Sequence, residues 1–424
     1  MKKLALIVIA IFLLGVWGVV PGSSAGYGPQ QTVVVAKDIS DAVTLDPNLA
    51  YEESGIVAVL QMYSTLVKFP IGKLTQVGPD VASSWDVSKD GRTFTFHLKH
   101  GIKFASGNTL TADDVLYSFQ RVVNLPKDPA SWLITQMGID DKSVATAVTA
   151  PDPYTVVINV PTTFSPGAFL SIMANPVVSI VDSKTVRAHV QGGDFGTPWL
   201  NDHSAGSGPY MLAQWQRQVT IDLVPNPNYN LGPAPTVKRI VFPNIMESTV
   251  QQQVLNRGDA DIAWTLTSQQ LADLKRSSTF YVASTPNLAM EYLGMDVKNV
   301  PAFSKPQVLQ AVKYAIDYNG IINDLIAGNG APLQGVIPKG LFGYDASLPV
   351  HDVAKAKQLL SEAGYGSGFN VELLASTGTE PGGVSSGDLA SKIKNDLAAV
   401  GIRVDVRQLV TSEKLGLYRA QKTQ

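Results

Sequence analysis

Few side chains in this sequence are spaced so that they could perform chemistry. Two of the five histidines, His97 and His100, are three residues apart. In or beside a strand this spacing points them to opposite faces, so we expect a solvated pair and no metal site. The sequence has no cysteine, which excludes disulfides, thiolate zinc sites and cysteine nucleophiles. We expect no cofactor.

One serine stands in a pattern that hydrolases use. Residues 383–387 read Gly-Val-Ser-Ser-Gly, and a nucleophile elbow needs a strand directly before the serine and a helix directly after it. The strand predicted at 370–375 ends too early for this. We therefore expect Ser385 to lie in a flexible loop before a helix at 389–400. A secreted hydrolase that uses Ser385 is the alternative from another functional class.

Length and composition limit the possible classes. A chain of 424 residues can bury a large core and should hold two or three domains. Only 16% of the residues are charged, and no block of like charge stands out. Nucleic acid is therefore not an expected partner.

The N-terminus has the pattern of a targeting segment. Lys2-Lys3 precedes an uncharged apolar run at 4–20, and small residues at 23–25 suit signal peptidase. We expect a signal peptide at 1–25 and a periplasmic or extracytoplasmic protein. An uncleaved membrane anchor is the alternative, because seventeen apolar residues are close to the shortest bilayer span. Without a cysteine, a lipid-anchored form is not expected.

The most informative elements lie at 79–123. Asp90-Gly91 predicts a tight turn between two strands, and the alternation at 93–98 puts Phe94, Phe96 and Leu98 on one face. Thr111 with Asp114 three residues later predicts a capped helix. This explains the acidic pair Asp113-Asp114 as helix capping and not as an acid–base pair.

In this order, these elements resemble the family 5 extracellular solute-binding proteins, which are peptide- and oligopeptide-type receptors of ABC importers. The residues that carry the resemblance are Ala82, Trp85, Ser88, Asp90, Gly91, Phe94, Phe96, Leu98, Lys99, Gly101, Phe104, Gly107, Leu110, Thr111, Ala112, Asp114, Val115, Tyr117 and Ser118. Further family motifs follow at 45–47 (Leu-Asp-Pro), 206–210 (Gly-Ser-Gly-Pro-Tyr), 226–229 and 258–262.

The resemblance implies an α/β fold of the type II periplasmic-binding-protein kind, with two lobes and an α+β subdomain inserted in lobe I. We expect lobe I at 28–65 and 204–287, the inserted subdomain at 66–203, and lobe II at 288–424. Relatives continue past the position of Gln424, so lobe II is expected to be incomplete, which predicts weak binding or low stability.

Local patterns predict further elements in both lobes. A helix at 247–256 should turn Val250 inward, and a glycine C-cap at Gly258 should lead into a central strand. In lobe II, Ser304 and Asp352 are expected to cap two helices, and Ile402, Val404 and Val406 alternate as a strand.

The resemblance also implies where a ligand would bind. The loop after the Asp-Pro motif contacts ligand in relatives, and here it contains Tyr51, Glu52 and Glu53. Backbone pairing with an extended peptide would fit at this loop. After the motif at 258–262, Trp264 and Thr265 follow Ala263; Trp264 is either a flat apolar platform or a core residue.

At the entry to lobe II, Met290 and Tyr292 are further candidates. The implied function is solute capture by closure of two lobes, without chemistry. The expected partners are a small-molecule or peptide ligand and an ABC permease, and the protein is expected to be a monomer. An oligosaccharide or other solute is the alternative ligand.

Overall fold

The computed structural model describes most of the chain beyond its N-terminus. The described residues are 31–73, 76–125, 129–283, 289–338, 344–345, 347, 350–380, 382–420 and 422. The expected signal peptide at 1–25 lies outside these ranges. Among the described residues there is no helix with the length and apolarity of a bilayer-spanning segment.

A five-stranded sheet joins strands from two distant parts of the sequence, in the order β11-β1-β10-β9-β8. We call it, with its helices, the N-terminal unit. Its elements are β1 (Thr32–Ala36), α1 (Glu53–Met62), β8 (Tyr210–Gln216), β9 (Thr220–Pro225), β10 (Arg239–Pro243), α8 (Ser248–Arg257), β11 (Ile262–Ala263) and α9 (Ser268–Lys275). Strand β1 runs parallel to β10 and β11, and the other pairs are antiparallel.

Two expectations for this unit were wrong. Strand β11 is an edge strand of this sheet and not a central one. In α8, Val250 is 41% exposed and Gln251 is fully buried. The Gln251 side-chain amide donates to the Ile245 carbonyl and the Thr265 hydroxyl, each at 2.7 Å. Hydrogen bonding, which apolar periodicity does not reveal, therefore selects the inner face of α8.

Between α1 and β8, the chain forms an inserted unit around a four-stranded sheet of order β4-β5-β7-β6. Its strands are β2 (Val67–Lys68), β3 (Gly78–Pro79), β4 (Ala82–Val87), β5 (Thr93–Leu98), β6 (Val148–Asp152) and β7 (Thr155–Asn159). Its helices are α2 (Ala112–Asn124), α3 (Pro129–Thr135), α4 (Val144–Ala147), α5 (Pro166–Met173), the 3-10 helix η1 (Pro176–Val178), α6 (Ser183–Arg187) and α7 (Thr197–Leu200).

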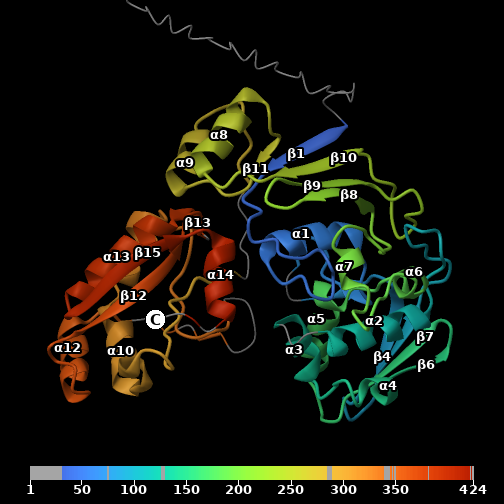
Figure 1. Cartoon of the computed structure of the whole chain (residues 1–424), viewed down its shortest axis with the longest axis horizontal. Helices are drawn as coiled ribbons and strands as arrows, with labels where there is room; N and C mark the ends of the chain where they lie inside the picture. The colour runs from blue at the N-terminus through green and yellow to red at the C-terminus, as the bar shows by residue number, and fades with distance from the viewer. Residues whose placement is uncertain are drawn as a thin grey trace, which may run out of the picture.

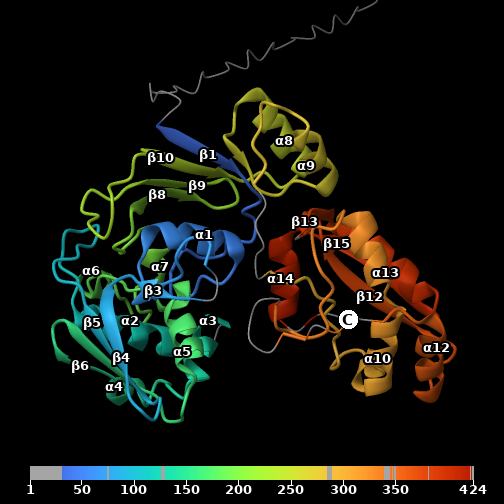
Figure 2. The same ribbon diagram turned by 180° about the vertical axis from the view of Figure 1, so that it is seen from behind.

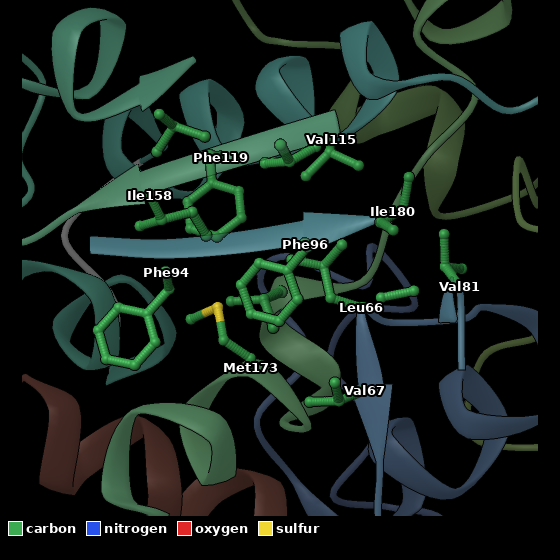
Figure 3. Packing of buried hydrophobic residues seen from close by; sticks show 14 of the residues in the cluster. Leu66, Val67, Val81, Phe94, Phe96, Val115, Phe119, Ile158, Met173 and Ile180 are labelled. Atoms are coloured by element: carbon green, nitrogen blue, oxygen red, sulfur yellow. The ribbon is translucent and has the colours of Figure 1, made fainter. Parts of the chain in front are cut away.

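The predicted turn, strand and capped helix of this unit are confirmed. Gly91 has φ of 67°, in the left-handed region that glycine tolerates. Phe94 and Phe96 are fully buried and pack with Phe119 of α2 in the core shown in Figure 3. At the start of α2, the Thr111 backbone N–H donates to the Asp114 carboxylate at 2.8 Å.

The C-terminal unit, which comprises the described residues from 289 onward, is built on the parallel pair β12 (Phe369–Ser376) and β15 (Ile402–Leu409). A short hairpin joins β13 (Thr379–Glu380) to β14 (Val384–Ser385). The helices are η2 (Pro301–Ser304), α10 (Pro306–Ala315), α11 (Tyr318–Gly320), the π-helix η3 (Ile321–Leu325), α12 (Val353–Glu362), α13 (Ser386–Ala398) and α14 (Thr411–Arg419). The apolar sides of β12 and β15 pack on α10, α12 and α13.

Only one of the two predicted helix caps in this unit is confirmed. Asp352 caps α12, and its carboxylate accepts from the Lys355 backbone N–H at 2.8 Å. The residue before α10 is Lys305, whereas Ser304 lies in η2 and donates its hydroxyl to the Pro301 carbonyl. Ser385 ends β14 and caps α13, so the loop expected there is wrong, and α13 begins three residues earlier than expected.

Two buried features hold the inserted unit on the N-terminal unit. Arg121 of α2 pairs with Asp46, and both side chains are fully buried. At the return to β8, Gly206 and Gly208 lie directly against the end of α1, and the Gly208 backbone N–H donates to the Met62 carbonyl at 2.9 Å. The motif at 206–210 therefore needs glycine because no side chain fits between these backbones.

Figures 1 and 2 show the C-terminal unit beside the other two, with α8 and α9 near the β13–β14 hairpin and α14 on the side toward α1. The hairpin contacts α9 directly. The Ser268 backbone N–H donates to the Gly383 carbonyl at 2.9 Å, and the Ser268 hydroxyl donates to the Gly382 carbonyl at 2.8 Å. The chain limits predicted for lobes and subdomain stay a prediction.

Candidate functional site

The carboxyl ends of β1 and β11 bring two candidate side chains together. Lys37 follows β1, and Trp264 follows β11 and donates its backbone N–H to the Ala36 carbonyl at 3.0 Å. The Lys37 ammonium lies 5.4 Å from the centroid of the Trp264 ring. In open α/β sheets, ligands bind outside the carboxyl ends of the strands. Trp264 is 46% exposed, so the core alternative for this residue is wrong.

Glu53, the first residue of α1, joins this pair. Its Oε1 atom accepts from Lys37 Nζ at 3.2 Å and from Trp264 Nε1 at 3.1 Å. The lysine side chain is 4% exposed and the glutamate side chain 63% exposed. The three side chains therefore form a fixed charged and aromatic group, with a buried cation beneath an exposed carboxylate.

Tyr51, two residues before Glu53 in the chain, lies close to tyrosines of the C-terminal unit. Tyr51 precedes α1 and is 51% exposed, while Tyr292 and Tyr418 of the C-terminal unit are 71% and 63% exposed. Tyr292 is hydrogen-bonded to Tyr418, and loss of solvent around its hydroxyl, with the neighbouring Tyr418, Glu291 and Tyr51, raises the pKa of Tyr292. Tyr51 and Tyr292 thus lie near each other although they belong to different units.

The remaining predicted residues do not all join this group. Glu52 is buried. The Thr265 backbone N–H donates to the Gln251 side-chain carbonyl at 3.1 Å. Met290 is exposed, two residues before Tyr292 in the chain. The structure therefore brings together Glu53 with Trp264, and Tyr51 with Tyr292, and leaves Glu52 and Thr265 in packing positions.

A second charged cluster lies in the C-terminal unit. The Lys414 ammonium donates to the Ser376 hydroxyl at 3.1 Å, and Ser376 and Ser386 both donate to the Glu380 carboxylate. Removal of water by surrounding protein atoms, with repulsion from Glu380, raises the pKa of Glu291 to about 7, while Lys414 opposes this shift. Glu291 therefore changes charge near neutral pH.

This shift predicts a pH-dependent stability. Because the folded-state pKa of Glu291 exceeds its ordinary value of 4.5, the folded protein binds the extra proton and loses stability as the pH rises from about 4.5 through about 7. Part of the Glu291 residue remains in contact with solvent, which reduces the effect. Urea unfolding between pH 5 and pH 8 should show a smaller fall in stability for Glu291→Gln than for the wild type.

Glu362→Gln, which removes an exposed carboxylate on α12, is the control and should follow the wild-type pH dependence. Identical pH dependence of wild type and Glu291→Gln would contradict the role given to Glu291.

An open hollow with no aromatic residue in its lining lies in the C-terminal unit. It has a volume of about 1070 Å³ and is lined by residues 299–301, by residues of β12 and β15, and by Lys422. All of its lining comes from the C-terminal unit. It therefore does not bring two units onto one ligand, and the aromatic groups are the better candidate site.

The residues that could do chemistry occupy structural positions. His97 bonds to Asp86 at 3.0 Å, and His100 stacks on Tyr154. The Ser385 hydroxyl accepts from the Asp388 backbone N–H, as a helix cap. In the part of the chain that the structure describes, no three histidine or acidic side chains gather as a metal site.

Sequence reasoning missed Lys37, Tyr418 and Glu291. A single lysine after an apolar strand is typical of a solvent-facing residue, so its burial had no local signal. Tyr418 lies on the last helix, far in sequence from the motifs. For Lys37, the one available signal was its position directly after the apolar run at 32–36.

The arrangement of the sheets is that of the type II periplasmic-binding-protein fold. Two solved structures share this fold. The murein tripeptide binding protein MppA of Escherichia coli superposes with a TM-score of 0.79 at 23% identity, over 93% of this chain and 78% of that chain. A Helicobacter pylori periplasmic binding protein, DppA, in complex with the peptide STSA gives 0.78 at 24% identity, over 91% and 75%.

The chain belongs to the bacterial extracellular solute-binding proteins, family 5, whose middle-region model matches residues 76–424. The probable D,D-dipeptide-binding periplasmic protein DdpA of Escherichia coli K12 is 35% identical over 334 residues, which are 78% of this chain. The dipeptide-binding protein of the same organism is 29% identical over 370 residues, 81% of this chain and 65% of that protein.

The chain spans 62% of the length of DdpA. The family and fold are those of solute-binding receptors and not of enzymes, as the sequence predicts.

Proposed function

We propose that this chain acts as the extracytoplasmic solute-binding component of an ABC importer and that peptides are its ligands. The observation that supports the proposal is that Tyr51 of the N-terminal unit lies close to the Tyr292–Tyr418 pair of the C-terminal unit. Tyr51 and Trp264 come from the N-terminal unit, and Tyr292 and Tyr418 from the C-terminal unit. Aromatic rings bury large apolar areas, so a ligand held between the units gains from both.

The names of the relatives support peptides over other solutes. They include a D,D-dipeptide-binding, a dipeptide-binding and two glutathione-binding proteins. Other solved structures of this fold hold different solutes, such as agropinic acid or a nickel–histidine complex. A different small solute, including an oligosaccharide, is therefore the alternative ligand.

The proposal includes the binding residues and the partners. Tyr51, Glu53, Trp264 and Tyr292 would contact the ligand, with Met290 beside them, and Glu52 and Thr265 would support the loops. The closed form would be recognised by a membrane permease. The protein would act as a monomer outside the cytoplasm.

Thermal unfolding with a panel of dipeptides tests the binding. A ligand at one hundred times its Kd stabilises a protein by about 2.7 kcal/mol, so a bound dipeptide should raise the Tm clearly. Absence of any shift across L,L- and D,D-dipeptides, with a shift for a sugar or an opine, would favour the alternative ligand.

Replacing Trp264 by alanine should weaken binding of the best dipeptide about tenfold or more, because a central aromatic contact is lost. Calorimetry gives the Kd. Trp132→Ala is the matched control, since Trp132 is also exposed, at 64%, but lies on α3 of the inserted unit. Equal affinity of Trp264→Ala and wild type would remove Trp264 from the site.

A further inference from the structure

Lys37 is an unusual residue at the end of a strand, because its cation is buried. A buried charge is costly unless it is paired. Its backbone is fixed, since the Ile245 N–H donates to the Lys37 carbonyl at 2.9 Å. Its ammonium is fixed too, by Glu53 at 3.2 Å and by the face of Trp264.

The two hydrogen bonds to Glu53 converge on one oxygen. Both Lys37 Nζ and Trp264 Nε1 donate to Oε1. An ionised carboxylate has about four acceptor positions on its two oxygens. Among the described residues, no side chain donates a hydrogen bond to Glu53 Oε2. The Glu53 side chain is 63% exposed. Glu53 is thus held by one oxygen and offers the other to solvent.

A second carboxyl group, that of Asp41, lies close to Lys37 and Glu53. Asp41 is near enough to both Lys37 and Glu53 to be influenced by their charges, and the loss of water around it raises the pKa of its carboxyl. The Oδ1 atom of Asp41 is buried without a hydrogen-bond partner in the described structure. Asp38 lies beside Gly378 of the C-terminal unit, where a Cβ would be 3.5 Å from its Oδ2. Glu53 and Asp41 are therefore two carboxyl groups that act on the one Lys37 ammonium.

We propose that Lys37 is a positioning residue that fixes the Glu53 carboxylate and the Trp264 indole in one arrangement, so that Glu53 Oε2 accepts a hydrogen bond from an ammonium or amide N–H of the ligand. This inference rests on the proposed function. The subsite in the N-terminal unit would bind a hydrogen-bond donor of the ligand beside an aromatic ring. Affinity would depend on Lys37 although the ligand does not touch it.

The first test needs no ligand. In ¹⁵N-labelled protein, the Trp264 indole N–H resonance, assigned through Trp264→Phe, reports its hydrogen bond to Glu53. Lys37→Met should move this resonance toward that of a solvent-exposed indole, because the carboxylate loses its second anchor. Lys37→Arg should largely keep it. An unchanged resonance in Lys37→Met would overturn the inference.

The second test uses calorimetry with L-alanyl-L-alanine as the probe. Lys37→Met and Glu53→Gln should each weaken binding about tenfold, and the double variant should be no weaker than Glu53→Gln alone, because Lys37 acts through Glu53. Additive losses, or wild-type affinity in Lys37→Met, would overturn the inference. If wild type itself binds no dipeptide, the proposed function fails, and the indole resonance alone decides whether Lys37 positions Glu53.

Discussion

Replacing Arg121 by methionine is expected to lower the free energy of unfolding by about 3–5 kcal/mol. Both Arg121 and its partner Asp46 are fully buried. The guanidinium donates to the two carboxylate oxygens at 3.1 and 2.6 Å and to the Phe195 carbonyl at 2.9 Å. Methionine fills similar space but leaves the Asp46 charge buried without its cation, and this uncompensated charge causes the loss.

Urea unfolding at neutral pH measures this loss. Arg217→Met is the matched control, because Arg217 pairs with Asp202 at the surface, where the two side chains are 52% and 58% exposed. Exposed ion pairs contribute about 0–1 kcal/mol, so the control should unfold nearly as the wild type does. A loss for Arg121→Met as small as that of the control would show that Asp46 is solvated or protonated without its partner.

Replacing Gly206 by alanine is expected to destabilise the protein by about 3 kcal/mol, the upper part of the range for overpacked sites. A Cβ at this position would be 2.0 Å from the Met62 carbonyl oxygen and 2.7 Å from the Tyr63 ring. The first of these neighbours is backbone at the end of α1, so it cannot rotate away. The Gly206 carbonyl also accepts from the Ala105 N–H at 2.9 Å, which limits movement of Gly206 itself.

Thermal and urea unfolding of Gly206→Ala test this close approach. Gly167→Ala is the control: Gly167 lies in α5, and its added Cβ would have no neighbour within 4 Å. In a helix, alanine is favoured over glycine by about 0.8–1.0 kcal/mol, so the control should be neutral or more stable. If Gly206→Ala unfolds like Gly167→Ala, the backbones of 206 and Met62 are not in contact in solution.

The sequence predicted those parts of the fold whose signals are local. The turn at Gly91, the alternation of Phe94 and Phe96, and the cap at Asp352 follow from a few adjacent residues, and all three are confirmed. The family and fold class followed from motifs. Of the candidate site, Glu53 and Trp264 were named and do lie together. Their role in binding stays a prediction.

Two of the misses arise from side-chain pairing that apolar spacing does not reveal. Gln251 is buried because Thr265 and Ile245 satisfy its amide, so apolar spacing predicted the wrong face of α8. Lys37 is buried because Glu53 and Trp264 meet it from other segments. The spacing of apolar residues in the sequence does not show the burial of Gln251 or of Lys37.

The contact between α9 and the β13–β14 hairpin limits which residues can change between related sequences. Among the described residues of the hairpin, the Gly382 and Gly383 carbonyls accept the hydrogen bonds from Ser268. A Cβ at 383 would lie 2.8 Å from the Ser268 nitrogen, so the contact excludes one. The hairpin contributes main-chain carbonyls to this contact, whereas α9 contributes the Ser268 hydroxyl as well as its backbone N–H. Side chains elsewhere on the two units can therefore change during evolution without altering this contact, provided that position 383 remains glycine.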